Sequence, residues 1–286
     1  MASVFRKPAL YLVGTPIGNL EDITLRALEV LKQVDVIACE DTRQTQKLLN
    51  HYGIEKKTIS YHQHNELTRA AELIMQMEQG QAIAVVTDAG MPGISDPGYR
   101  LTVLAVRHKI PVYPIPGASA FLSALVASGL PTDHFHFDGF LPPKLSQRRA
   151  VLESIKESTV TEIFYEAPHR LLDALADVVD LLGGHRRVVV ARELTKIHEE
   201  FLRGTAAEVL EQLKKRPEIL GEIVLLVGRH EEQAATPVVA KKNFRTRVRE
   251  LMKNEQLDER EAMKRVAKEA GVSKSEIYRE LQKGKK

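Results

Sequence analysis

The 286-residue sequence contains no tryptophan and a single cysteine, and aromatic residues make up only 5% of it. A lone cysteine, Cys39, cannot form an intrachain disulfide, and such sparse use of cysteine is typical of reducing compartments. No apolar run approaches the roughly 18–20 residues that span a bilayer, and the apolar stretch near the N-terminus is too short for a signal peptide. We therefore expect a cytoplasmic protein that does not enter a membrane.

The motifs of several common enzyme classes are also missing. The chain has neither the G-x-G-x-x-G dinucleotide pattern nor the G-x-x-x-x-G-K-[ST] phosphate loop, and it lacks the G-x-S-x-G element of hydrolases. His62 and His64 lie close in sequence, but no third ligand stands at a diagnostic spacing, so we expect no metal centre. Cys39 lies in an apolar run and is expected to be structural.

What the chain does have is an uneven charge distribution and a globular composition, with 43% hydrophobic and 28% charged residues. Residues 241–286 carry 15 lysines and arginines against 8 acidic residues, a net charge of +7, whereas the first 240 residues carry a net charge of −4. A basic tail suits an anionic partner, although a solvated helical face would have the same composition. Residues 258–284, with Gly271 and Ser273 between two helical patterns, resemble a helix-turn-helix.

Strand-like and helix-like patterns alternate along the body of the chain. Short β-branched runs predict strands at 9–13, 34–39, 57–61, 81–86, 110–115, 134–140, 161–166, 186–193 and 222–228. Helical spacing predicts helices at 22–33, 45–53, 66–80, 99–109, 147–157, 168–182 and 205–215. This alternation predicts an α/β protein whose first sheet is mostly parallel and covered on both faces.

Loops after the predicted strands are rich in glycine and proline. VVTDAGMPGISDPG, residues 85–98, follows the fourth strand, while GTPIGNLED and PGASA follow the first and the fifth. Glycine lets a backbone approach a ligand closely, and ligands of α/β sheets bind beyond the carboxyl ends of the strands. These loops contain no lysine or arginine, so a cationic or zwitterionic ligand suits them better than a polyphosphate. The alternative is that the glycines and prolines form tight turns and bind no ligand.

Seven segments in this order resemble the tetrapyrrole-methylase superfamily of S-adenosylmethionine-dependent enzymes. The segments are LYLVGTPIGNLEDIT, ACEDTR, HQHNE, VVTDAGMPGISDPG, PIPGASA, GFLPPK and FYEAPHR. The resemblance covers roughly residues 8–230 and is strongest to the bacterial branch that methylates the ribose 2′-hydroxyl of a decoding-centre cytidine in 16S ribosomal RNA. It implies two α/β domains, 1–117 and 118–230, that flank a deep cleft and differ from the usual methyltransferase Rossmann fold, followed by a linker and basic helical tail at 231–286.

The resemblance also implies a methyl donor, a partner and a set of binding residues. S-adenosylmethionine would lie in the cleft, no metal would be needed, and the protein would be a homodimer that acts on 16S ribosomal RNA, expected within the assembled 30S subunit. The residues expected to contact the donor are Pro16, Gly18, Asp88, Ala89, Gly90, Ile94, Ser119, Ala120, Ala167, Leu194 and Thr195. Asp88 or Asp96 could counter the positive charges of the donor, or could cap turns instead.

The proton acceptor for a ribose hydroxyl is less constrained by the sequence. Asp22, Asp41, Glu166 and His169 are candidates near the expected cleft, and we favour Glu166 and His169, with Lys144 to stabilise an oxyanion or a phosphate. The residues expected to contact RNA are Lys144, Arg148, Arg149, Lys264, Arg265 and Lys274. The basic tail would position the RNA or contribute to dimer contacts.

Two other functions are compatible with parts of the pattern. Methylation of a tetrapyrrole would use the same donor, but the basic tail and the HQHNE and FLPPK loops argue against it. A ligand-sensing regulator with a DNA-binding tail would leave the seven segments without a purpose.

Overall fold

The computed structural model describes residues 5–230, 244–254 and 257–270, together with residues 275, 277 and 278. The chain forms two compact units, Met1–His230 and Glu231–Lys286. The described residues of the second unit form helices α9 (Phe244–Asn254) and α10 (Glu259–Ala270). No helix among the described residues is long and apolar enough to cross a membrane.

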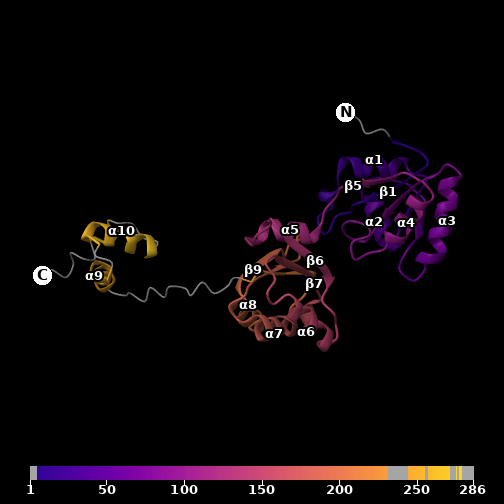
Figure 1. The fold of residues 1–286 in the computed structure, drawn as a ribbon. Coiled ribbons are helices and arrows are strands. Elements are labelled where there is room, and N and C mark those ends of the chain that lie inside the picture. The colour runs from indigo at the N-terminus through magenta and orange to yellow at the C-terminus, as the bar shows by residue number, and fades with distance from the viewer. Residues whose placement is uncertain (1–4, 231–243, 255–256, 271–274, 276, 279–286) are drawn as a thin grey trace. The chain divides into compact units, whose positions relative to one another are not determined.

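A parallel five-stranded sheet forms the first half of the larger unit (Figure 1). Its strands are β1 (Ala9–Val13), β2 (Val36–Cys39), β3 (Thr58–Ser60), β4 (Ala82–Val86) and β5 (Val112–Ile115), in the order β3-β2-β4-β1-β5. Its helices are η1 (Leu20–Asp22), α1 (Leu25–Gln33), α2 (Thr42–His51), α3 (Glu66–Glu78) and α4 (Tyr99–Arg107). Helices α1 and α2 pack on one face and α3 and α4 on the other, as the alternating pattern predicts.

Local side chains fix where several of these helices begin. The Thr24 hydroxyl accepts a hydrogen bond from the Ala27 N–H at the start of α1, and Asp41 accepts one from the Arg43 N–H at the start of α2. Such caps satisfy backbone donors that have no partner within the helix. Both helices therefore start directly after the loops that lie at the carboxyl edge of the sheet.

A mixed five-stranded sheet forms the second half, in the order β6-β7-β10-β8-β9. Its strands are β6 (Phe135–Phe140), β7 (Thr161–Glu166), β8 (Arg187–Arg192), β9 (Glu200–Thr205) and β10 (Ile223–Val227). Its helices are α5 (Ala120–Ser128), α6 (Leu145–Ser154), η2 (Pro168–Arg170), α7 (Leu171–Leu182) and α8 (Ala206–Lys214). Figure 1 shows α6, α7 and α8 together on one side of the sheet, with α5 on the other, and each side has its own apolar cluster.

The connection between the two halves runs from β5 to α5. The first sheet ends at Ile115, and α5 already packs on the second sheet through Ala124 and Leu125. We propose that the boundary between the two α/β domains lies at 117/118, because this position falls between β5 and α5. The second compact unit starts at Glu231, where the tail is expected to begin. Gly271, Ser273 and Lys274 of the expected tail motif lie outside the described residues.

The tail unit has a small core of its own among the described residues. Its buried members are Val248, Leu251, Ala262, Met263, Val266, Ala267 and Ile277. Lys264 and Arg265 lie on the exposed side of α10. The predicted helix at the start of the helix-turn-helix pattern is therefore present as α10, while the turn that would follow it is not described.

Candidate functional site

Three loops of the first sheet meet at the carboxyl ends of β1, β4 and β5. Thr15, after β1, exchanges two backbone hydrogen bonds with Gly90, after β4, at 2.9 and 3.1 Å. The Thr15 hydroxyl also donates to the Thr87 carbonyl at 3.0 Å. This bracing holds the loop of residues 85–98 against the first glycine-rich loop.

Glycine allows the first and third of these loops to touch backbone to backbone. A Cβ atom on Gly117 would lie 2.7 Å from the Gly14 Cα, and a Cβ on Gly14 would lie equally close to the Gly117 Cα. Real Cβ contacts are essentially never below 3.0 Å, so both positions require glycine in this arrangement. Gly14 and Gly117 thus serve close loop packing at this edge.

A turn of the second half closes against the β1 loop. Thr195 has φ +65, an uncommon conformation for a β-branched residue, and its N–H donates to Glu199 at 2.7 Å. Its hydroxyl accepts a hydrogen bond from the Asn19 N–H at 3.0 Å. A Cβ on Gly18 would lie 2.7 Å from the Thr195 Oγ1 and 2.9 Å from the Leu194 carbonyl, so glycine permits this contact as well.

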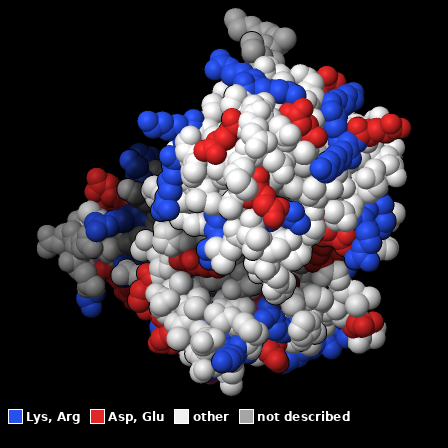
Figure 2. Space-filling model, turned by 90° about the vertical axis from the view of Figure 1, so that its right-hand side faces the viewer, with Lys and Arg blue, Asp and Glu red and all other residues white. Residues whose placement is uncertain are grey.

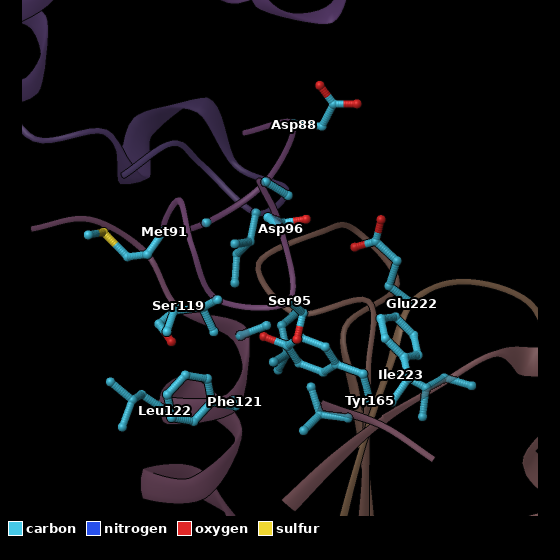
Figure 3. Close-up of a pocket in the computed structure, with 18 of the residues that line it drawn as sticks. Asp88, Met91, Ser95, Asp96, Ser119, Phe121, Leu122, Tyr165, Glu222 and Ile223 are labelled. Atoms are coloured by element: carbon cyan, nitrogen blue, oxygen red, sulfur yellow. The ribbon is translucent and has the colours of Figure 1, made fainter. Parts of the chain in front are cut away.

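These loops surround a cavity of about 780 Å³. Figure 3 shows Asp88 and Asp96 on the side of the first sheet, and Tyr165, Glu222 and Ile223 on the side of the second. Phe121 and Leu122 of α5 form part of the apolar wall, with Ile94 and Phe140. No lysine, arginine or histidine lines the cavity in the described part of the chain. Its volume falls within the range of sites for small molecules and cofactors.

Carboxyl groups give this cavity a negative character. Burial raises the pKa of Asp96 to about 7, with further contributions from the nearby negative charges of Glu40 and Asp88. Partial desolvation also raises the pKa of Asp88, as it does that of Glu40. Burial raises the pKa of Tyr165 to about 12, and the Asp96 charge adds to the shift. Carboxylates that repel one another in a partly dry site favour a positively charged ligand.

Residues 9–210 match the family model described as Tetrapyrrole (Corrin/Porphyrin) Methylases. The chain belongs to this family. Methylases of the family use S-adenosylmethionine as methyl donor, so this compound is the cofactor of the chain.

Three curated relatives match between 78% and 96% of the methylase. A protein of Halalkalibacterium halodurans named Ribosomal RNA small subunit methyltransferase I is 50% identical over 274 residues, which are 95% of this chain and 94% of the relative. Proteins with the same name from Mesorhizobium japonicum and Escherichia coli O157:H7 are 46% and 49% identical, over 96% and 78% of this chain and 92% and 79% of their own.

Solved structures share the fold at low sequence identity. A uroporphyrin-III-C-methyltransferase from Thermus thermophilus superposes with a TM-score of 0.54 at 20% identity, covering 77% of this chain and 94% of its own. A diphthine synthase superposes with a TM-score of 0.59 at 15% identity, covering 77% and 90%. The expected fold, two α/β halves of tetrapyrrole-methylase type, is confirmed.

The cavity of the methylase fits S-adenosylmethionine. The donor carries a sulfonium and an amino group, both positive, one carboxylate and no phosphate, so its net charge is positive and suits a wall with carboxylates and without cationic side chains. The apolar side chains of Ile94, Phe121 and Leu122 can contact an adenosyl group, and the close glycine turns expose backbone groups to its polar edges.

Most residues predicted to contact the donor lie around this cavity. Those that line it are Asp88, Ala89, Gly90, Ile94, Ser119, Ala120, Ala167 and Leu194. Pro16, Gly18 and Thr195 do not line it; Gly18 and Thr195 instead hold the closing turn described above. The contacts of the lining residues with the donor remain predictions.

The candidates for proton transfer are scattered. Glu166 lines the cavity, but its Oε1 accepts from the Ala167 N–H at 2.7 Å and lies 2.6 Å from Arg170 Nη2. The Ala167 N–H and the Arg170 guanidinium both occupy Oε1, so this geometry favours a role for Glu166 in positioning the turn after β7. His169 and Lys144 are exposed and do not line the cavity.

Neither earlier aspartate candidate gains support as a base. Hydrogen bonds from Arg43 lower the pKa of Asp41 to about 2, and Asp41 caps α2. Asp22 lies at the end of η1 and does not line the cavity.

The structure corrects one of the predicted RNA contacts. Arg148 is only 5% exposed and its Nε lies 2.7 Å from Asp177 Oδ2, so its guanidinium is buried in an ion pair rather than offered to phosphate. Arg149 is partly exposed and pairs with both Asp177 and Asp180. Lys144 is exposed at the start of α6.

Several residues of the cavity wall were not predicted as site residues. Tyr165 lies within the FYEAPHR segment, and Met91 within the loop of residues 85–98. The sequence therefore marked both segments as part of the site but did not single out these two residues. Glu222 and Phe121 also line the cavity, but no motif in the sequence marked them. Among the described residues, no group of three or more histidine, cysteine or acidic side chains could hold a metal.

Proposed function

We propose that this methylase transfers the methyl group of S-adenosylmethionine to the 2′-hydroxyl of a decoding-centre cytidine in 16S ribosomal RNA, within the 30S subunit and hence in the cytoplasm. The observation that carries the RNA substrate is the 50% identity, over 95% of the chain, to a relative named Ribosomal RNA small subunit methyltransferase I. The choice of the ribose hydroxyl and of a cytidine rests on the seven segments named above.

The donor supplies a methyl group on a positively charged sulfonium, which is already activated for displacement. Asp88 and Asp96 are proposed to stabilise the positive end of the donor, because their carboxyl groups lie on one side of the cavity and repel one another when it is empty of cations. The remaining task of the protein is to align the acceptor hydroxyl and exclude water. Such alignment can lower a barrier by ~7–11 kcal/mol.

The acceptor base is proposed to stack on Phe140. Phe140 lines the cavity, is 57% exposed, and packs edge-on against Tyr165 with ring centroids 5.4 Å apart. Enzymes that do chemistry on a base take the nucleotide out of the stack and hold the base against aromatic or apolar side chains. We propose that this methylase holds the base in the same way in order to present the ribose. A partly exposed aromatic ring at the cavity, fixed from behind by a second ring, meets that need.

Phosphates of the RNA are proposed to contact cations outside the cavity. Lys144 lies just before α6 and Arg149 lies on it, while Lys264, Arg265 and Lys274 belong to the basic tail. Figure 2 shows lysines and arginines spread over the face of the molecule that it presents, among acidic side chains, and side chains of both signs beside the hollow across its middle.

A homodimer is proposed with α5 at its interface. The segment AFLSALVAS is apolar on nearly every side, and Val126 remains 75% exposed in the single chain. A helix that is apolar all round is normally buried on every side. Light scattering should therefore give twice the chain mass for the wild type and the chain mass for Val126→Asp; a wild type that runs as a single chain would contradict the dimer.

The substrate is tested by offering three acceptors with radiolabelled S-adenosylmethionine. We expect methyl transfer to 30S subunits from a strain that lacks this gene, weaker transfer to naked 16S ribosomal RNA, and none to a corrin precursor. Transfer to the corrin alone would replace the RNA substrate by a tetrapyrrole. Tight donor binding without transfer to any acceptor would leave only the cofactor assignment.

A further inference from the structure

A second, open hollow lies between α2 and the edge strand β3. It has a volume of about 470 Å³ and is lined by Thr42, Arg43, Gln46, Lys47, Asn50 and Thr58. Because β3 is the last strand in the order β3-β2-β4-β1-β5, one side of this strand is not covered by the sheet. The hollow is therefore a groove along the outside of the first half, separate in its lining from the donor cavity.

Every lining side chain of this groove carries a hydrogen-bond donor, and none is acidic. The segment 42–60, which forms α2, the following loop and β3, contains Arg43, Lys47, Lys56 and Lys57 against one acidic residue, Glu55. The first 240 residues together have a net charge of −4. With Asp41, which pairs with Arg43, residues 41–60 still carry a net charge of +2, so the groove lies in a basic segment of a body whose net charge is negative.

Contacts within the groove orient these donors and leave some of them available. Asp41 binds Arg43 through Nε and Nη2, at 3.2 and 2.8 Å, while the Arg43 side chain stays 87% exposed. Lys47 contacts the Gln44 Oε1 at 3.1 Å and pairs with no carboxylate among the described residues. Gln46 donates to Asn50 at 2.8 Å, which aligns the two amides one helical turn apart.

The groove begins beside the donor cavity. The Asp41 N–H, at the start of α2, donates to the Asp88 carboxylate at 3.2 Å, and Asp88 lines the cavity. The acidic cavity repels phosphates, so a polyanion that places one nucleotide there needs cations close by. Thr42 to Asn50 extend this supply of donors by about 12 Å along the helix.

We propose that this groove holds the sugar–phosphate backbone of the RNA strand that presents the target nucleotide to the cavity. The inference rests on the proposed RNA substrate and adds a binding site for it. Arg43 and Lys47 contact phosphate oxygens, and Gln46, Asn50 and Thr58 contact phosphate or ribose oxygens. Contacts of this kind position an RNA chain without reading its sequence.

The test uses the full chain with Lys47→Ala and Lys47→Glu, and Lys214→Ala as the matched control. Lys214 is an exposed lysine of α8 that pairs with Glu211 and lies on the second half. Binding of 30S subunits from a strain that lacks this gene is measured over a series of salt concentrations, with the KM for the same subunits and the affinity for S-adenosylmethionine.

We expect Lys47→Ala to raise the KM roughly tenfold at low salt, the effect of losing one charge-assisted contact, and to lower the salt-dependence slope of binding by about 1. Lys47→Glu should raise the KM further, whereas Lys214→Ala and donor binding should match the wild type. Unchanged KM and salt slope in both Lys47 variants, with an active wild type, would overturn the groove alone. A wild type that methylates no ribosomal RNA would instead overturn the proposed function.

Discussion

Asp96 lies in the wall of the cavity that is proposed to bind the donor, and substitution of this residue tests the electrostatics of that cavity. Its carboxyl group lies in the cavity wall, where burial and the charges of Glu40 and Asp88 raise its pKa to about 7. An ionised carboxylate there is unfavourable without a cation and favourable with one. The cost of ionising Asp96 in a partly dry site therefore affects its pKa, the affinity for the donor and the stability of the fold.

Asp96→Asn should weaken S-adenosylmethionine binding at least roughly tenfold, because the cation loses a charge-assisted partner. Isothermal titration calorimetry at pH 8 measures this loss. Because the folded pKa of Asp96 lies above its unfolded value, the ionised form destabilises the ligand-free fold above pH 7. The variant should therefore melt at or above the wild-type temperature at pH 8, and a lower melting temperature with unchanged affinity would contradict the role of Asp96.

Donor affinity should also depend on pH. Asp96 is protonated below its pKa of about 7, so the affinity of the wild type should rise between pH 6 and pH 8 and then level off, with proton release on binding near pH 6. Calorimetry in two buffers of different ionisation enthalpy measures the released protons. Asp96→Asn serves as the control and should lose most of this dependence; a wild-type affinity that falls over the same range would refute the assignment.

At the scale of elements, the loops after β1 and β5 pack directly against each other, because Gly14 and Gly117 let their backbones touch. Gly117→Ala would place a Cβ 2.7 Å from the Gly14 Cα, which forces the loops after β1 and β5 apart. We expect a loss of about 1–3 kcal/mol in the free energy of unfolding, together with weaker donor binding.

Thermal melting and calorimetry of Gly117→Ala check this expectation. Gly184→Ala is the control, since its nearest neighbour is the Ala207 methyl group, at 3.3 Å, and it lies away from the cavity. Equal effects of the two substitutions on donor binding would mean that the loop contact does not shape the cavity.

Elements with a clear pattern were predictable, and those without one were not. Strand β1 has the predicted bounds because a continuous apolar run lies between Pro8 and Gly14. Strand β7 has them because the apolar IFY lies between polar residues, shortly before Pro168. Helix α5 was missed because it is apolar all round and shows no helical periodicity, and β9 because EFLRGT has one apolar pair between charged residues. β9 forms its ladder with β8, a tertiary pairing that local sequence does not specify.

The candidate site divides in the same way. The loop residues Asp88 to Ile94 were predictable, since glycine and proline mark a loop that follows a parallel strand. Glu222 was not, because its place in the wall depends on β10 lying between β7 and β8 in a mixed sheet. His169 and Lys144 lie within the segments FYEAPHR and GFLPPK, but both are exposed outside the cavity.

For the whole molecule, the basic tail is proposed to add to the RNA contacts of the body without contributing to donor binding. The acidic body holds the cavity, and the basic tail forms a compact unit with its own apolar cluster. Removal of residues 231–286 should therefore leave donor affinity within about twofold of the wild type but raise the KM for 30S subunits at least roughly tenfold, since several phosphate contacts are lost. Lys264→Ala with Arg265→Ala should give a smaller change in the same direction, and an unchanged KM would assign the tail another role.

The central claim is tested most directly by mapping the methylated nucleotide. Ribosomal RNA from a strain that lacks this gene is digested and compared by mass spectrometry before and after incubation of its 30S subunits with the protein and S-adenosylmethionine. The account predicts a single new 2′-O-methylcytidine in the decoding centre of 16S ribosomal RNA. A methyl group on a base, on another nucleotide, or present already in the deletion strain would contradict it.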